Sequence, residues 1–257
     1  MSRYDFRSPR LFVEAALAPG AQVPLGRDQG NYLGNVLRLG AGAAVLAFNG
    51  RDGEWRATIA GRKRPEALEV AEQIRPQDRL PDVAYVFAPL KHARLDYMAQ
   101  KAVEMGAGRL QPVLTQHTQV HRLNTERMRA NVVEAAEQCG ILSLAEVGEP
   151  IGLDRFLAGR AGGERLLVFC DEDAEIADPV AALTAARDAA TKGVDLLVGP
   201  EGGFSTEERG VLLKQPNILR LALGPRIMRA DTAAVAALAL VQAVVGDWKD
   251  AGTIFDH

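Results

Sequence analysis

Residues 195–205, with the sequence DLLVGPEGGFS, decide the fold class of this chain. The stretch opens with an apolar run that predicts a buried strand. Three glycines within the next five residues permit positive φ angles and a close approach of the backbone to a ligand. Ser205 and Glu208 have the spacing of a capping box, which predicts that a helix begins there. Open α/β sheets bind ligands where a strand gives way to a helix in this manner, so the stretch is a candidate site.

A second stretch of the same kind is LGPRIMRADTA, at residues 223–233. It joins a predicted strand at 218–223 to an alanine-rich helix over 233–245. Arg229 and Asp231 lie two residues apart where this apolar helix begins, and charges held at the core are costly unless they are paired or used. The pattern therefore favours either a functional pair or a helix N-cap formed by Asp231 or Thr232, with Arg229 as the partner of Asp231.

Apolar runs and helical periodicity alternate through the rest of the C-terminal part. Strands are predicted at 83–88, 110–114, 166–169, 194–198 and 218–223. Helices are predicted over 95–103 with a stop at Gly106, over 125–138 and 179–190, from Ser205, and over the final apolar segment. Strict alternation of the two elements indicates an α/β domain with a mostly parallel sheet that is covered on both faces.

The N-terminal part has a different pattern. Short strands are predicted at 11–13, 36–39, 43–48 and 55–59, and no helix is expected among them. Asn49-Gly50 and Asp52-Gly53 accept positive φ and predict a hairpin between the last two strands. Several short strands separated by turns favour a small β-barrel. A polar stretch with two prolines at 75–81 predicts a linker, so we expect a β-domain at 1–75 and the α/β domain at 76–257.

Composition limits the class of protein. With 257 residues and 47% hydrophobic residues the chain can form a real core. Cys139 and Cys170 lack the spacing of a disulfide scaffold, are expected to be buried as small hydrophobes, and suit a reducing cytoplasm. No secretory signal is visible, and the apolar run at 233–245 is too short to span a membrane, which needs about 20 residues. We therefore expect a cytoplasmic protein without a membrane partner.

Charge narrows the ligand. Residues 1–80 carry 12 Lys or Arg against 9 Asp or Glu in a chain of net charge −3, which is compatible with RNA contact through the first domain. Glu201 argues against a phosphate loop at 199–203, whereas a cationic or zwitterionic ligand such as the sulfonium of S-adenosylmethionine fits better. His117, His121 and Cys139 lack a defined shared face, so no metal is expected.

Together, the GPEGGFS and LGPRIMRADTA segments resemble the bacterial ribosomal RNA uridine-N3 methyltransferases, the RsmE family, of the knotted SPOUT superfamily. Residues 10–12 and 31–38 resemble that family's PUA-like domain. The helix from Lys91 to Gly106 and the block at 134–138 resemble further family segments, so the likeness covers nearly the whole chain. Asp231 stands where the family usually has Glu, Asn31 where it often has His, and Ile141 or a neighbour where Arg is expected.

The resemblance implies a trefoil-knotted SPOUT domain, a PUA-like RNA-binding β-barrel, S-adenosyl-L-methionine as cofactor, 16S ribosomal RNA in the small ribosomal subunit as substrate, and a homodimer. The implied cofactor-binding residues are Phe169, Cys170, Gly199, Pro200, Glu201, Gly202, Gly203, Leu223, Gly224, Ile227, Met228 and Arg229. The residues expected to hold RNA are Arg3, Arg7, Arg10, Arg38, Lys91 and Arg94.

The chemistry that we expect is in-line attack of uridine N3 on the methyl group. The N3 proton must leave, and Glu201 or Asp231 is the candidate acceptor. Arg229 would stabilise negative charge that spreads to the base carbonyl oxygens. These three residues are the candidate catalytic group, and no cysteine nucleophile is needed.

Three other functions remain open at this point. One is a SPOUT enzyme that methylates ribose 2′-O of transfer RNA, although such enzymes usually carry an Asn/Ser-rich final loop where this chain has residues 228–232. Another is a non-catalytic RNA-binding protein of ribosome assembly. The third is a metabolic enzyme that uses a nucleotide, but no GxGxxG or P-loop follows a predicted strand.

Overall fold

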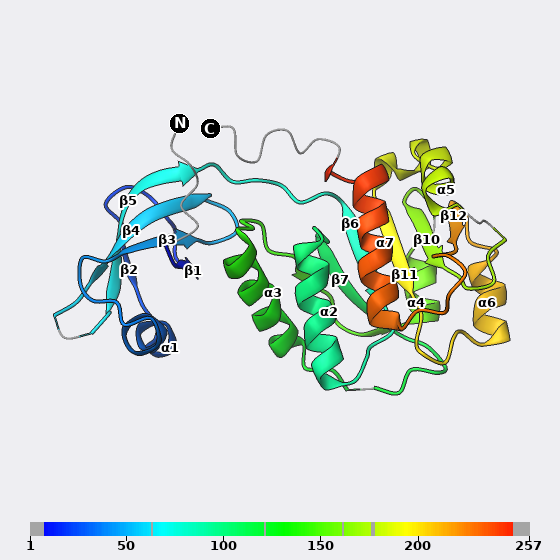
Figure 1. The fold of residues 1–257 in the computed structure, drawn as a ribbon, viewed down its shortest axis with the longest axis horizontal. Coiled ribbons are helices and arrows are strands. Elements are labelled where there is room, and N and C mark those ends of the chain that lie inside the picture. The colour runs from blue at the N-terminus through cyan, green and yellow to red at the C-terminus, as the bar shows by residue number, and fades with distance from the viewer. Residues whose placement is uncertain (1–7, 63, 121, 161, 176–177, 249–257) are drawn as a thin grey trace. The chain divides into compact units, whose positions relative to one another are not determined.

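The computed structural model of the chain describes residues 8–62, 64–120, 122–160, 162–175 and 178–248, and they form two compact units (Figure 1). The first unit contains the described residues up to Arg79 together with Ala136–Leu144, and the second contains Leu80–Ala135 and the described residues from Ala145 onward. The structural division therefore falls a few residues beyond the boundary expected at 75/76. It also adds a segment that sequence alone did not assign to the first domain.

The first unit is built on a five-stranded sheet with the order β1-β3-β4-β5-β2. Its elements are β1 (Arg10–Phe12), β2 (Gln22–Pro24), α1 (Arg27–Asn31), a π-helical turn (Tyr32–Val36), β3 (Ala44–Phe48), β4 (Glu54–Ala60) and β5 (Ala67–Arg75). β1 pairs in parallel with β3, and the other pairs are antiparallel. The predicted hairpin between β3 and β4 is confirmed, with positive φ angles at Gly50 and Gly53.

Two expectations for this unit are wrong. The apolar run at 36–39 is not a strand, and a helix does interrupt the strands, because α1 continues into the π-helical turn at Tyr32–Val36. Leu33, which belongs to this turn, is fully buried in the core of the first unit, and Leu37 and Leu39 pack against that core. A short apolar run fits a strand and the last turn of a helix equally well, so periodicity could not separate the two.

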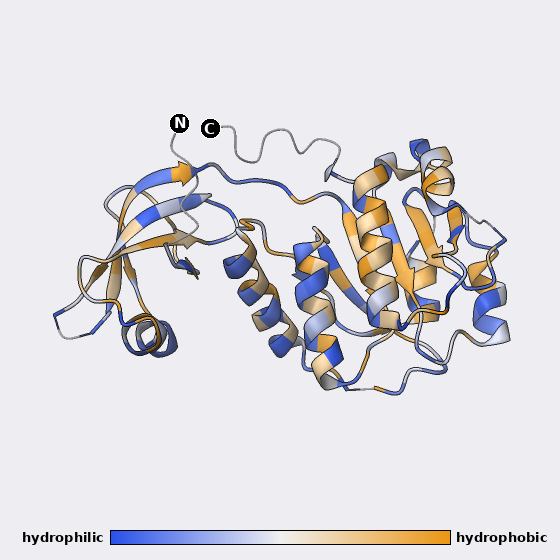
Figure 2. Cartoon of the chain, in the orientation of Figure 1, coloured by the Kyte–Doolittle hydropathy of each residue, from blue (hydrophilic) through white to orange (hydrophobic). Residues whose placement is uncertain are grey.

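The second unit is an α/β domain whose described strand pairs are all parallel. The sheet has the order β12-β10-β11-β6-β7-β8, with β9 beside β7. The strands are β6 (Val83–Phe87), β7 (Arg109–Leu114), β8 (Glu146–Val147), β9 (Ile151–Gly152), β10 (Leu166–Cys170), β11 (Val194–Val198) and β12 (Ile218–Leu221). Figure 2 shows the central strands as mostly hydrophobic, with a few hydrophilic positions such as Asp195 of β11, as expected of strands buried on both faces.

Helices cover both faces of this sheet. They are α2 (His92–Glu104), α3 (Thr125–Cys139), α4 (Leu153–Gly159), α5 (Pro179–Ala185), α6 (Thr206–Leu212) and α7 (Ala230–Val244), with a 3-10 helix at Asp188–Lys192. α7 packs on α2, α5 and β11. α4 and α6 contribute Leu157 and Leu212 to a separate cluster with Leu197 of the sheet. The described residues contain no helix long and apolar enough to cross a membrane.

The predicted strands and helices of this unit are confirmed with three differences. The helix expected over 179–190 ends at Ala185 and is followed by the 3-10 helix, because the segment lacks a sustained apolar face. The final helix begins three residues earlier than expected, so its N-cap is Arg229 and not Asp231 or Thr232. The elements between residues 146 and 159 were not predicted, since each is too short to show a period.

Candidate active site

Three loops meet at one edge of the parallel sheet. They follow β10, β11 and β12, which are neighbours in the strand order, so their carboxyl ends lie side by side. This is the edge at which open α/β sheets bind ligands. The loop residues expected to bind the cofactor at 199–203 and 223–229, and the end of β10 at Cys170, are thereby brought to one edge of the sheet.

The loop after β11 is shaped by its glycines. A Cβ at Gly199 would lie 2.5 Å from the ring of Phe204, so only glycine lets the strand end pass this ring. Phe204 in turn meets the ring of Phe169 edge to face, with centroids 5.3 Å apart. The predicted capping box is confirmed, because the Ser205 hydroxyl accepts from the Glu208 backbone N–H at 3.2 Å and the Glu208 carboxylate accepts from the Ser205 N–H at 3.0 Å. The loop is therefore fixed at both ends.

The loop that follows β7 contacts the glycine loop, residues 199–203, and the helix after it. Nδ1 of His117 lies 3.1 Å from the Gly202 carbonyl oxygen and 3.0 Å from that of Gly203. The backbone N–H of Gln116 donates to the Glu208 carboxylate at 2.7 Å. His117 thus contacts the loop backbone, and no group of three potential metal ligands occurs among the residues that the structure describes. His121 lies outside the described residues.

Arg94 of α2 joins the two carboxylates that were predicted to be catalytic. Its guanidinium hydrogen-bonds to the carboxylate of Glu201, and its Nε lies 4.0 Å from Oδ2 of Asp231. The side chain of Asp231 is 20% exposed and that of Glu201 is 47% exposed, so Asp231 is the more enclosed of the two. Arg94 was expected to contact RNA, whereas the structure places it between these carboxylates.

Arg229 lies at the N-terminus of α7 with an exposed side chain. It makes no side-chain hydrogen bond or ion pair with any residue in the described ranges. The ion pair of Asp231 is with Arg94, so the alternative in which Arg229 is its partner is wrong. Ile227, two residues earlier, is 92% exposed. An arginine and a large apolar side chain are thus presented to solvent by the loop after β12.

Two further groups at this edge are held neutral by burial. Burial raises the pKa of the Cys170 thiol to about 12, so the thiol is protonated at neutral pH. Burial also raises the pKa of Tyr85 on β6, and the negative charges of Cys170, once its thiol ionises, and of Asp231 add to the effect. Neither group is a nucleophile in this state. Cys139 is exposed and Cys170 is partly buried, so the expectation that both cysteines are buried is wrong for Cys139 and holds only in part for Cys170.

Asp171 was missed by sequence reasoning although it directly follows β10. It is 5% exposed, and its carboxylate accepts from Arg209 of α6 at 3.0 Å and from Arg220 of β12 at 2.7 Å. These pairs tie the start of the loop after β10 to the neighbouring strand and helix. A single Asp after an apolar run carries no distinctive signal, so only the structure could assign it this place.

The site has room for a ligand beside the loop backbone. A Cβ built at Gly203 or Gly224 would meet no non-neighbouring heavy atom of the described residues within 4 Å, so these glycines border open space. Both have positive φ, +71° and +105°, which only glycine adopts without strain. Phe169 is 1% exposed and packs into the core, so only its backbone can face a ligand. Exposed loop backbone beside two carboxylates fits a positively charged adenosyl cofactor.

The residues expected to hold RNA divide into different environments. Arg38 and Lys91 are exposed and available, and Arg3 and Arg7 lie outside the described residues. Arg10 is 9% exposed, because its guanidinium is enclosed by hydrogen-bond partners within the first unit. It donates to Glu54 at 2.6 Å and to backbone carbonyl oxygens of residues 136, 137 and 141, and it stacks on a phenylalanine ring. Because Arg10 is buried in this way, the expectation that it contacts RNA is wrong.

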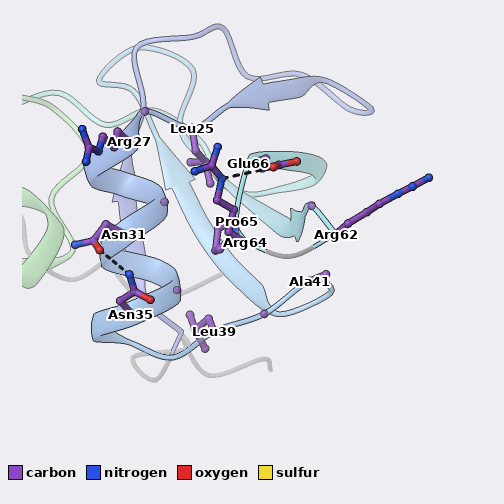
Figure 3. Close-up of a pocket in the computed structure, with 15 residues that line it drawn as sticks. Leu25, Arg27, Asn31, Asn35, Leu39, Ala41, Arg62, Arg64, Pro65 and Glu66 are labelled. Carbon is purple, nitrogen blue, oxygen red and sulfur yellow. Dashed lines mark hydrogen bonds and ion pairs between the residues drawn. The ribbon is translucent and has the colours of Figure 1, made fainter.

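A polar groove opens on the first unit between α1 with its π-helical turn and the turn that joins β4 to β5 (Figure 3). Its volume is about 780 Å³, and it is bordered by Arg27, Arg62 and Arg64. The side chains of Asn31 and Asn35, joined by a 2.7 Å hydrogen bond, lie along the helical side. Nothing in the sequence distinguishes these arginines from ordinary surface charges, because only the fold places them together.

Both units match known protein families. The model of an RNA methyltransferase domain matches residues 77–242, and the model of an RNA methyltransferase PUA domain matches residues 25–70. The protein named Ribosomal RNA small subunit methyltransferase E of Synechocystis is 30% identical over 92% of this chain and 78% of its own length. The protein of the same name from Rickettsia conorii is 27% identical over 91% of this chain and 94% of its own length.

Solved structures agree with these matches. A putative methyltransferase from Legionella pneumophila, in complex with the bound cofactor SAM, is 28% identical with a TM-score of 0.74, covering 92% of this chain and 98% of its own. A Ribosomal RNA small subunit methyltransferase E from Neisseria gonorrhoeae, bound to S-adenosyl methionine, has a TM-score of 0.78 at 24% identity, over 94% of this chain and 100% of its own. The latter likeness establishes a shared fold across both units.

Proposed function

The chain belongs to the family of RNA methyltransferases with a PUA domain, and on that premise we propose that it methylates N3 of a uridine in small-subunit ribosomal RNA, with S-adenosylmethionine as methyl donor. The names of its relatives support ribosomal RNA of the small subunit as the substrate class. Relatives of the same fold bind this cofactor. A ribosomal RNA substrate places the reaction in the cytoplasm, and the resemblance to the family favours a homodimer.

The observation that carries the proposal is the meeting of Glu201, Asp231 and Arg94 at the carboxyl edge of the sheet. Arg229, two residues before Asp231 in the chain, pairs with none of the described residues. S-adenosylmethionine supplies an electrophilic methyl group on a positively charged sulfur. The loop backbone at Gly199–Gly203 and Leu223–Met228, with the end of β10 at Phe169 and Cys170, would hold it. The two carboxylates balance the charges of Arg94 and Arg229, so the site lacks the excess of positive charge that a phosphate site needs, and its carboxylates favour a sulfonium.

The chain's own residues perform the proton chemistry. Neutral uridine carries a proton on N3, and in this reaction a new N3–carbon bond forms as the carbon–sulfur bond breaks. Asp231 or Glu201 accepts the N3 proton. Arg229, which has no partner within the described ranges, is free to donate hydrogen bonds to the base carbonyl oxygens as negative charge develops there. No thiolate is needed, in keeping with the raised pKa of Cys170.

The first unit supplies a surface for the rest of the RNA. The groove bordered by Arg27, Arg62 and Arg64 offers guanidinium groups for phosphates, and Asn31 and Asn35 offer amides that can bond to base edges. With Arg38 and Lys91, these arginines replace Arg10 in the proposed RNA-binding set. Phosphate contacts would position the RNA without reading its sequence.

The test is methyl transfer from isotopically labelled S-adenosylmethionine to small ribosomal subunits that lack the modification, followed by nucleoside mass spectrometry. We expect labelled N3-methyluridine with the wild-type chain. Arg229→Ala should lower the turnover by about 100-fold or more, as removal of a transition-state hydrogen-bond donor does, with cofactor affinity nearly unchanged. Arg187→Ala, which removes an exposed arginine distant in the chain from these loops, is the control.

Each alternative outcome has a separate meaning. Label on transfer RNA or on ribose would keep the cofactor and discard the proposed substrate. Cofactor binding without label on any RNA would indicate a non-catalytic RNA-binding protein. Equal losses of turnover and cofactor affinity in Arg229→Ala would remove the catalytic role of this arginine. The oligomeric state is checked by light scattering of the purified chain, where a monomer mass would contradict the homodimer.

A further inference from the structure

The second unit contains another cavity, on the face of its sheet against which α4 packs. It has a volume of about 420 Å³ and extends from the first residues of the strands to Val86, near the end of β6. Ala84 of β6, Arg109 of β7 and Asp195 of β11 are at the first or second positions of their strands, and all three line it. The described residues that line it include neither Arg94, Glu201 nor Asp231, nor any residue of the loops after β11 and β12, so the cavity is distinct from the candidate active site.

The cavity is rich in arginine. Arg109, Arg155, Arg160 and Arg165 line it, against two carboxylates, those of Glu149 and Asp195. Both carboxylates are already paired. Asp195 binds Arg160 and Arg165, and Glu149 accepts from Arg129 on α3 at 2.9 Å. The lining is therefore left with an excess of positive charge.

Two of the four arginines make no ion pair with any residue in the described ranges. Arg155 projects from α4 with an exposed side chain, and no hydrogen bond of this side chain is found there. Arg109 is also exposed, and its guanidinium donates only to the neutral amide oxygen of Gln111 at 2.9 Å. Guanidinium groups hold a planar fork of donors that matches the oxygens of a phosphate. Arg109 and Arg155 are therefore available to a ligand.

A buried donor gives a second and independent indication. Arg160 is 9% exposed, and its Nε is enclosed without a hydrogen-bond acceptor among the described atoms. Two of its four other N–H donors are used, one by Asp195 and one by the carbonyl oxygen of Arg165 at 2.9 Å. Burial lowers the pKa of Arg160, although the charge of Asp195 works against this. A buried N–H without an acceptor is costly, and this one belongs to a residue that lines the cavity.

We propose that this cavity binds a nucleotide phosphate, with Arg109 and Arg155 on the phosphate oxygens and the ring of Phe156 against the base. Phe156 lines the cavity with Ile151 and Val86, so an apolar wall faces the cluster of arginines. A phosphate alone would not contact this wall, whereas a nucleotide would place its base against the wall and its phosphate on the arginines. The volume of the cavity is that of a small-ligand site. The nucleotide is either free or part of an RNA strand. The proposal goes beyond methyl transfer and does not depend on it.

The experiment titrates the full-length chain with uridine 5′-monophosphate, in the presence of saturating S-adenosylhomocysteine so that the cofactor loops are occupied. Hydrogen–deuterium exchange of the peptides that cover residues 151–160 locates the binding. We expect slower exchange there, and a dissociation constant raised about tenfold or more in Arg155→Glu and in Arg109→Ala, the loss typical of a hydrogen bond to a charged group. Arg187→Glu makes the same change at an exposed arginine outside the cavity and should bind like the wild type.

A competing single-stranded RNA of ten nucleotides separates the two sources. If it displaces the mononucleotide and protects the same peptides, the natural occupant is part of an RNA. If it does not, a free nucleotide is the ligand. The proposal is overturned if neither probe protects residues 151–160, or if Arg155→Glu, Arg109→Ala and Arg187→Glu bind uridine 5′-monophosphate equally. These readings are independent of turnover, so they stand whether or not the methyl transfer proposed above is observed.

Discussion

The Arg10–Glu54–Arg75 cluster of the first unit and the Arg94–Glu201–Asp231 cluster of the second unit use the same charges in opposite ways. In the first, one carboxylate lies between two arginines, and the Glu54 side chain is fully buried. In the second, one arginine lies between two carboxylates, and all three side chains are partly exposed. The first cluster is net positive and enclosed, and the second is net negative and accessible.

The difference separates a structural role from a chemical one. Arg10 and Arg75 also donate hydrogen bonds to backbone carbonyl oxygens of residues 136–141, and these bonds hold that segment in the first unit. A carboxylate so enclosed cannot reach a substrate. Glu201 and Asp231 have room to accept a proton or to face a sulfonium, and Arg94 satisfies only part of their hydrogen-bonding capacity. Accessibility and an excess of carboxylate thus distinguish the second cluster, which we propose to be the reactive one.

The largest effect that we expect is the loss of the proton acceptor. Asp231→Asn should lower kcat by about 100-fold to 10,000-fold, the usual contribution of general-base catalysis, and Glu201→Gln should lower it less. The reason is that Asp231 is the more enclosed carboxylate. Single-turnover rates and the cofactor dissociation constant are measured for both variants. A greater loss in Glu201→Gln would assign the base to Glu201, and a loss confined to cofactor affinity would make both carboxylates binding groups only.

A substitution in the buried Arg10–Glu54–Arg75 cluster should lower the free energy of unfolding and should not act on the reaction itself. Glu54→Gln leaves Arg10 and Arg75 buried without a counter-charge, and we expect about 3–5 kcal/mol less free energy of unfolding. The matched control is Glu72→Gln on the adjacent strand β5, whose pair with Arg56 is exposed and should contribute less than about 1 kcal/mol. Denaturant unfolding of both variants gives the comparison. Similar losses in the two would contradict the distinction between a buried and an exposed ion pair.

Arg94 tests whether the bridge positions the carboxylates or contacts RNA. We expect Arg94→Ala to lower kcat roughly tenfold, the value of a hydrogen bond to a charged group, with little change in the KM for RNA. Arg94→Lys should restore part of the rate, because it keeps the charge but not the forked geometry. A raised KM with unchanged kcat would instead return Arg94 to the RNA contacts that the sequence suggested.

Local features of the site were predictable from sequence because neighbouring residues determine them. The strand before Gly199, the glycine turn and the capping box of Ser205 and Glu208 all depend on groups within a few positions. The resemblance to a family then supplied the cofactor and the substrate class. The position of Arg229 at the N-cap of the final helix was missed by two residues, since Asp and Thr are stronger N-cap residues than Arg.

Features that depend on distant contacts were not predictable. Burial of Arg10 requires carbonyl oxygens from residues more than 120 positions away, and nothing near Arg10 signals them. The same holds for Arg94, whose carboxylate partner Glu201 is 107 residues distant in the chain. The groove of the first unit brings Arg27 to Arg62 and Arg64 only because α1 and the π-helical turn form at residues 27–36, where no helix was expected. The sequence identifies the charged residues, but only the fold shows which of them are buried and paired and which are accessible.

The smallest effects concern the cysteines, which repeat the contrast between buried and exposed groups. Burial raises the pKa of Cys170 to about 12, so the reactive thiolate is scarce at pH 8, whereas Cys139 is exposed. We expect iodoacetamide at pH 8 to modify Cys139 well before Cys170, as read by mass spectrometry over time. Because the folded thiol holds its proton above the usual pKa, any stabilisation from it is present below pH 9 and declines as the pH rises toward 12.

Cys170→Ala should therefore keep methyl transfer within about threefold of the wild type, the cost of a small packing change of less than 1 kcal/mol. The thiol lies at the carboxyl edge beside the proposed cofactor loops, so its removal is a stringent test of a reaction without a covalent nucleophile. Cys139→Ala is the matched control. A loss of several hundredfold in Cys170→Ala alone, with the fold and cofactor affinity intact, would require a thiol in the chemistry. That result would contradict attack by N3 on the methyl group and would favour a different target atom on the base.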